Sequence, residues 1–109
     1  MKYEREQQDR DFRKAVWQRD GYECRWCGCP VQRSLGRTAE RGEVHHIHGR
    51  LGILRWEVKA ALLLCCECHE KVTGRVNERW RIVGDKTFTA ADGHKYTDAT
   101  HGVTFERIA

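Results

Sequence analysis

The chain has 109 residues, of which 39% are hydrophobic and 33% are charged. This length suffices for one domain with a small core, and small domains commonly need a metal or disulfides for stability. The longest apolar run, residues 60–66, is far too short to cross a membrane, which excludes a membrane-spanning protein.

The six cysteines can form disulfides or bind metal, depending on the compartment. The N-terminal residues MKYEREQQDR are charged throughout and lack the pattern of a secretory signal. We therefore expect a cytoplasmic protein, in which thiols stay reduced and spaced cysteine pairs are more often zinc ligands than disulfides.

The net charge of +4 lies entirely before residue 81, since residues 81–109 carry four basic and four acidic side chains. Between residues 31 and 59, six basic side chains outnumber three acidic ones. The basic residues of this stretch are Arg33, Arg37, Arg41, Arg50, Arg55 and Lys59. Such a stretch suits contact with phosphates and equally suits a solvated loop surface.

The first half of the chain predicts a helix followed by a tight turn. Residues 6–19 contain good helix formers, with Phe12, Ala15 and Val16 on one side, and a glycine follows the helix at Gly21. The sequence CRWCGCP then suggests a cysteine knuckle, and RSLGRTAERG suggests an irregular loop.

The second half predicts strands around a short helix. EVHHI reads as a strand entering a turn, ALLLC as the returning strand with its leucines buried, and CECHEKVTG as a helix closed by Gly74. Residues 78–109 hold short β-prone runs separated by turn signals, which favours an antiparallel β meander. We thus expect one α+β domain over residues 1–109, with its central part at 24–74.

Two CxxC pairs, Cys24 with Cys27 and Cys65 with Cys68, form the strongest motif. Tetrahedral zinc prefers four such thiolates from two knuckles, so we expect a structural zinc. Two disulfides or a redox-active pair are the alternatives. Cys29 and Cys66 fall outside the spacing and are expected to pack, although either could replace a ligand.

The histidines are less specific when each is considered alone. His45 and His46 are neighbours on a predicted strand, so their side chains should point to opposite faces. His69 follows the second cysteine pair at the start of the short helix. A lone histidine is usually a surface residue or a hydrogen-bonded polar one, and His48 in the turn has the same ordinary interpretation.

The order CRWC, EVHHI and LLLCCECHE resembles the zinc-stabilised, four-cysteine branch of the HNH endonucleases, which are built on a ββα-metal (His-Me) finger. The resemblance spans residues 12–74. It implies a small ββα-metal finger stapled by a four-cysteine zinc site, and metal-dependent hydrolysis of DNA phosphodiester bonds.

The resemblance implies a role for each matching residue. His46 is the expected general base, which suits an imidazole that titrates near neutral pH. His45 and His69 are the expected ligands of a catalytic divalent metal, Mn²⁺, Ni²⁺ or Mg²⁺, which would neutralise charge on the phosphate. Cys24, Cys27, Cys65 and Cys68 match the structural zinc ligands.

Two positions differ from the family pattern. Ala60 stands where the family normally has an asparagine that ties down the loop or orients the histidine pair, and Thr73 stands where some members have a further histidine ligand. Arg50 and Arg55 are candidate phosphate contacts, because guanidinium groups match phosphate oxygens. His48 could support the base, the metal or a phosphate contact.

The expected protein is a monomer or weak dimer that nicks one strand of double-stranded DNA. Two imidazoles with few carboxylates favour borderline transition ions, so manganese or nickel should support activity at least as well as magnesium. Two other functions remain open: a zinc-dependent nucleic-acid-binding module with a vestigial nuclease site, and a structural zinc protein that acts through protein partners.

Overall fold

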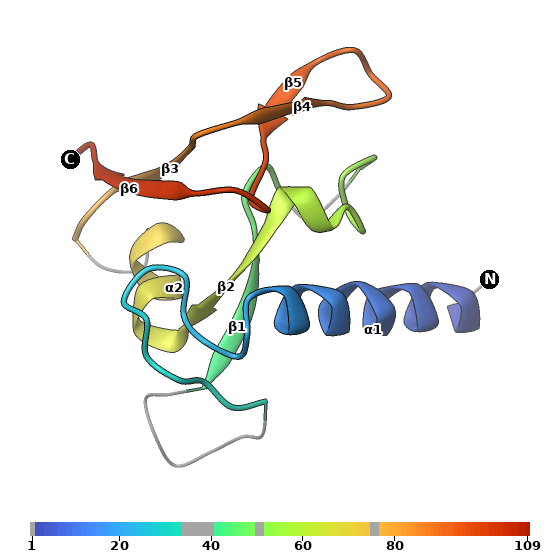
Figure 1. Cartoon of the computed structure of the whole chain (residues 1–109), viewed down its shortest axis with the longest axis horizontal. Coiled ribbons are helices and arrows are strands. Elements are labelled where there is room, and N and C mark those ends of the chain that lie inside the picture. The colour runs from blue at the N-terminus through green and yellow to red at the C-terminus, as the bar shows by residue number, and fades with distance from the viewer. Residues whose placement is uncertain (1, 34–40, 50–51, 75–76) are drawn as a thin grey trace.

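A computed structural model of the chain describes residues 2–33, 41–49, 52–74 and 77–109 (Figure 1). It is a small α+β domain with antiparallel strand pairs. The elements in chain order are α1 (Lys2–Arg19), β1 (Gly42–His46), a 3₁₀ turn η1 (Val58–Ala60), β2 (Ala61–Cys65), α2 (Cys66–Val72), β3 (Trp80–Gly84), β4 (Thr87–Thr89), β5 (Lys95–Thr97) and β6 (Val103–Arg107). No helix among these described residues is both long and apolar enough to cross a membrane.

The hairpin of β1 and β2 lies at the centre of the domain, with α1 and α2 on either side (Figure 1). Its register pairs Val44 with Leu63 and His45 with Leu62. All five residues of β2 are buried, because α1 and α2 both contact this strand. The prediction that the leucines of the returning strand are buried is confirmed, since Leu62, Leu63 and Leu64 have no exposed surface.

Helix α1 begins at Lys2, four residues before the predicted start. Its first half is exposed and charged, so no apolar periodicity marks it in the sequence. The second half buries Phe12, Val16 and Trp17 against the hairpin. The packed half therefore fixes the position of α1 relative to β1 and β2.

The predicted C-terminal meander is wrong in its strand pairing. A meander would pair β3 with β4, whereas β3 pairs with β6 and β4 pairs with β5. One of the expected turn signals, GDK at residues 84–86, does not reverse the chain. The Asp85 amide there donates to Gly102 O (2.9 Å), and Lys86 O accepts from the Asp98 amide (2.9 Å), so both residues pair with the opposite arm. The chain reverses at 90–94 instead, and the result is one long hairpin with a bend in each arm.

This C-terminal hairpin packs on the first cysteine knuckle through aromatic rings. Trp26, between the first two cysteines, stacks on Phe105 with ring centroids 4.4 Å apart and meets Trp80 edge-on at 4.6 Å. Offset and edge-to-face ring pairs of this kind add to the free energy of apolar burial. The hairpin is thereby attached to the cysteine-bearing part of the domain.

Candidate functional site

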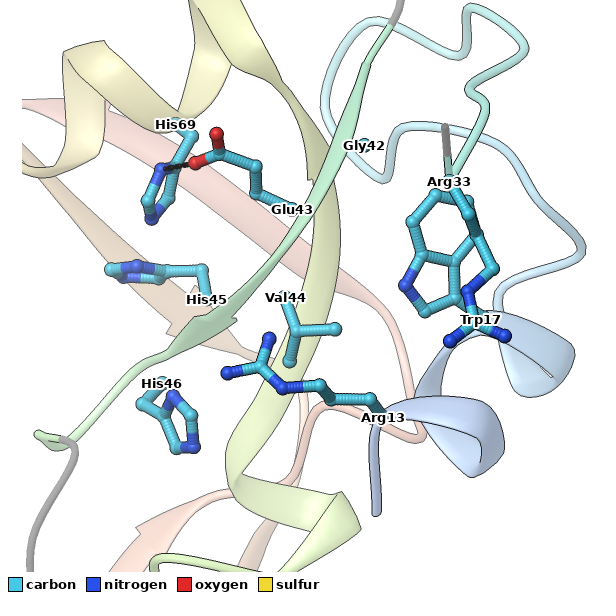
Figure 2. A pocket seen from close by; sticks show the side chains of 9 residues that line it. All are labelled: Arg13, Trp17, Arg33, Gly42, Glu43, Val44, His45, His46 and His69. Atoms are coloured by element: carbon cyan, nitrogen blue, oxygen red, sulfur yellow. Dashed lines mark ion pairs between the residues drawn. The ribbon is translucent and has the colours of Figure 1, made fainter. Parts of the chain in front are cut away.

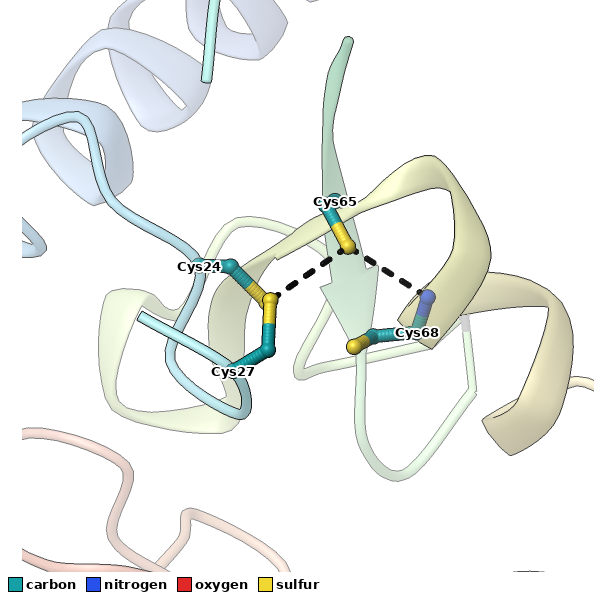
Figure 3. A group of neighbouring side chains, drawn as sticks. All are labelled: Cys24, Cys27, Cys65 and Cys68. Atoms are coloured by element: carbon teal, nitrogen blue, oxygen red, sulfur yellow. Dashed lines mark hydrogen bonds between the residues drawn. The ribbon is translucent and has the colours of Figure 1, made fainter. Parts of the chain in front are cut away.

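The two CxxC pairs come together in a single cluster (Figure 3). The Sγ atoms of Cys24, Cys27, Cys65 and Cys68 all lie within 4.8 Å of one another. The amide of Gly28 donates to Cys24 O (2.9 Å), which closes the first knuckle. Cys65 caps α2, and its Sγ accepts from the Cys68 amide at 3.5 Å. The cluster therefore joins the loop after α1 to the junction of β2 and α2.

Four thiols at this separation can hold a metal such as zinc. Burial raises the pKa of Cys68 and Cys65, because a buried thiolate without a cation is unfavourable. Burial also raises the pKa of Cys27, but hydrogen bonds from neighbouring cysteines outweigh it and lower that pKa to about 7. A bound divalent cation would stabilise all four thiolates together.

The structure contains no disulfide among the six cysteines, all of which are described. Cys29 lies beside the cluster, with its Sγ 3.3 Å from that of Cys27. Cys66 is half-buried at the first turn of α2, and its amide donates to Arg41 O (2.9 Å). The four expected cysteines thus form the cluster, and Cys66 lies outside it.

The histidines of β1 project to opposite sides of the hairpin, as predicted (Figure 2). The His45 ring lies 5.3 Å from the His69 ring of α2, measured between centroids. The His46 ring stacks on Phe12 of α1 at 5.1 Å. Strand alternation therefore brings His45 to His69 and leaves His46 facing α1.

Glu43 is a site residue that the sequence analysis missed. It shares the face of His45 on β1, and its carboxylate pairs with Nδ1 of His69. Arg41 donates to the other oxygen of the same carboxylate. Burial raises the pKa of Glu43, but the hydrogen bond from Arg41 and the charge of His69 lower it overall. The signal in the sequence was the spacing of two residues between Glu43 and His45.

The pKa of His45 is lowered to about 4 by burial, with further contributions from His69 and His46. The imidazole of His45 is accordingly neutral at pH 7 and has a nitrogen lone pair. A neutral imidazole is the form that binds a divalent metal.

His46 is fixed by a backbone carbonyl, because its Nε2 lies 3.1 Å from Arg55 O. The tautomer that donates from Nε2 has its basic lone pair on Nδ1. The loop that contains Arg55 is closed by the 3₁₀ turn at Ala60. The Ala60 amide donates to Glu57 O and the Ala60 carbonyl accepts from Ile47 N, both at 3.0 Å. Backbone hydrogen bonds therefore hold the loop at Ala60, where the HNH pattern that the sequence resembles has asparagine.

One open cavity of about 480 Å³ is lined by His45, His46 and His69 (Figure 2). Its other lining residues are Arg13, Trp17, Arg33, Gly42, Glu43 and Val44. Gly42 is required on one wall, since a Cβ there would overlap the Trp17 ring and lie 2.8 Å from Val31 Cγ2. Arg13 was not singled out from the sequence, and Arg33 was named there only as one of six basic residues in a stretch that suits phosphates or a solvated surface.

The remaining predicted site residues lie away from this cavity or outside the described residues. Arg50 belongs to the latter group. The Arg55 guanidinium lies over the Trp56 ring, 5.1 Å from its centroid. The ring of His48 packs against Tyr96 of β5 at 4.8 Å and lines a second cavity of about 260 Å³, together with His45. Burial lowers the pKa of His48, and a hydrogen bond with the Thr97 backbone partly offsets it.

The fold and the cysteine cluster together define a small α+β domain with a candidate metal centre. The cysteines are the only group of three or more potential ligands with closely spaced donor atoms that the described residues form. Comparisons of the chain with protein-family models, curated proteins and solved structures found no match.

Proposed function

We propose that the chain is a metal-dependent DNA endonuclease of the HNH type, in which β1, β2 and α2 form a ββα-metal finger and the four cysteines bind structural zinc. The observation that carries the proposal is that His45, His46 and His69, from β1 and α2, all line one cavity, which extends from the His69 side of β1 to its α1 side. The rings of His45 and His69 meet edge-to-face, and His46 is oriented by a carbonyl.

The proposed ligands of the catalytic metal are His45 and His69. Glu43 engages Nδ1 of His69, which directs the other ring nitrogen, Nε2, away from the carboxylate. A carboxylate partner of this kind fixes the tautomer and orientation of a metal-binding histidine. A divalent ion at this position would supply charge neutralisation for the phosphate.

The proposed base is His46. It takes a proton from water onto Nδ1, while its Nε2 proton stays bonded to Arg55 O. The resulting hydroxide attacks the phosphorus as the bond to the leaving sugar oxygen breaks, and that oxygen takes a proton from solvent water. Stacking on Phe12 and the carbonyl contact hold the ring in one orientation, which general-base catalysis requires.

We expect His46→Ala to reduce the nicking of supercoiled plasmid by at least about 100-fold, the smaller effect usual for loss of a general base. The measurement is the initial nicking rate with added divalent metal. His94→Ala is the matched control, because His94 is exposed in the turn between β4 and β5. Equal cutting by wild type and His46→Ala would remove His46 from the mechanism.

The choice of metal is a second expected result. Two imidazole ligands favour borderline transition ions over a site that needs only oxygen ligands. Manganese or nickel should therefore support nicking at least as well as magnesium in a titration at constant ionic strength. Activity with magnesium and none with manganese would contradict a site formed by His45 and His69.

A nucleic-acid-binding module with a vestigial nuclease site is the second candidate function, and Ala60 is the observation that favours it. Both candidates predict DNA binding that weakens with salt. Binding without nicking under every metal tested would select the binding module. Absence of salt-dependent binding would instead favour a zinc protein that acts through protein partners.

A further inference from the structure

We propose that Arg13 and Arg33 form a phosphate-binding site that holds the DNA backbone in the cavity, on the side opposite His45 and His69. The inference rests on the proposed nuclease function of this cavity. It assigns the recognition of the phosphodiester backbone to α1 and to the segment after the first knuckle, two parts of the chain outside the ββα unit.

The two guanidinium groups reach one cavity from separate segments. Arg13 extends from α1 toward β1, and Arg33 follows the knuckle and lies beside Trp17 (Figure 2). His46 lines the same cavity. An anion bound by the two arginines would therefore share the cavity with the proposed base.

Each arginine is held by a neighbour that leaves nitrogen donors for a ligand. Arg13 uses its Nε to bind Asp9 at 3.0 Å, an i,i+4 pair on α1, so this bond orients the remaining two amino groups. The Arg33 guanidinium carbon lies 5.9 Å from the Trp17 ring centroid. This contact uses the face of the guanidinium group, so the N–H donors along its edge can bind a ligand.

The charge balance of the cavity calls for an anion. Among the described residues that line the cavity, Glu43 is the one carboxylate, and it is already paired with Arg41 and His69. Asp9 pairs with Arg13 but does not line the cavity, so among the described lining residues the two guanidinium groups lack a carboxylate of their own. Paired guanidinium forks match the oxygens of a phosphodiester, the anion that repeats along DNA.

Two arginines were expected from the sequence, of which Arg50 lies outside the described residues and Arg55 is less suited to this role. Arg55 places its guanidinium on the Trp56 ring, and its contribution to the site is the carbonyl that orients His46. Arg13 and Arg33 instead lie in the cavity itself. In the cavity, the proposed phosphate contacts are therefore Arg13 and Arg33 in place of Arg55.

The test measures DNA binding in the His46→Ala protein, so that cleavage cannot interfere. The affinity for a short labelled duplex is followed as a function of salt concentration. Arg13→Ala and Arg33→Ala should each weaken binding about tenfold, as expected for one charge-assisted hydrogen-bonded contact. Each should also reduce the slope of log affinity against log salt by about 1, because one phosphate contact is lost.

Arg107→Ala is the control for loss of one positive charge, because Arg107 lies at the end of β6 and does not line the cavity. It should leave the slope unchanged. Arg13→Lys and Arg33→Lys keep the charge and should restore the slope. Thermal melting of each variant checks the fold, and Arg33 is exposed, so its replacement should not affect stability.

The outcomes separate this inference from the proposed function. Unchanged affinity and slope in both alanine variants would overturn the phosphate site even if the wild-type protein nicks DNA. Reduced slopes together with an inactive wild-type protein would support the phosphate site and count against catalysis by His46.

Discussion

If the four-cysteine cluster binds zinc as proposed, removal of that zinc, or replacement of Cys68 by serine, is expected to unfold the domain. The four sulfur atoms join the first knuckle to the end of β2 and the start of α2, and Cys68 is only 6% exposed. Zinc bound by four thiolates contributes about 10–16 kcal/mol to folding in small zinc domains. That is as large as the whole stability of a typical domain, about 5–15 kcal/mol.

The measurement combines zinc content per chain with thermal melting followed by circular dichroism, before and after a strong chelator. Cys66→Ser is the matched control, because Cys66 is adjacent in sequence to Cys65 but lies outside the cluster. It should keep its zinc and its melting temperature within a few degrees. A Cys68→Ser protein that still folds cooperatively with one zinc per chain would show that another residue completes the site.

The parts of the fold predicted correctly from the sequence are those encoded by local patterns. The paired cysteines, the leucine run and the glycine at the end of α2 each signal their structure within a few residues. The β1–β2 pairing agrees with the expectation that EVHHI enters a turn and ALLLC returns, although residues 47–60 separate the two strands. The sequence thus sufficed to predict the strand, strand, helix order of the central unit.

The missed site residues depend on contacts between distant segments. Arg13 reaches the cavity only because the second half of α1 packs Phe12 and Trp17 against the hairpin. Arg33 reaches it because the knuckle turns the chain back toward Trp17. In the sequence Arg13 looks like a solvated charge, since helix periodicity places it beside the apolar stripe without indicating what lies opposite. Arg33 belongs to a basic stretch that suits a solvated loop surface as well as phosphates.

The prediction of the strand pairing in the C-terminal part was wrong for a related reason. A turn signal indicates that the chain can bend, and only tertiary contacts decide whether it reverses. At Gly84, a Cβ would overlap the Thr97 side chain on the opposite arm, so glycine there permits a close approach of the two arms. The glycine in GDK reflects packing across the hairpin.

Asp20 connects the end of α1, the first knuckle, β2 and, through Arg25, the C-terminal hairpin. After loss of the cysteine cluster, replacement of Asp20 should cause the largest loss of folding free energy among the proposed changes. Its carboxylate has 2% exposure and accepts from Arg19 Nε (2.7 Å), Arg25 Nη1 (2.8 Å) and the Leu63 amide (2.9 Å). Both arginines in turn donate to carbonyls of other segments. These acceptors are Val58 and Ala61 for Arg19, and Ala99 and His101 for Arg25.

Replacing Asp20 by alanine should destabilise the zinc-bound protein by about 3–5 kcal/mol, because it leaves two largely buried guanidinium groups and a backbone amide without their acceptor. Urea unfolding at fixed zinc concentration measures this. Asp20→Asn keeps the size and one acceptor oxygen and should lose less, and exposed Asp11→Ala should change stability by less than about 0.5 kcal/mol. A loss below about 1 kcal/mol for Asp20→Ala would mean that water replaces the carboxylate. In that case the carbonyl contacts of Arg19 and Arg25, together with the ring contacts of Trp26, would hold the C-terminal hairpin and the 3₁₀ turn in place.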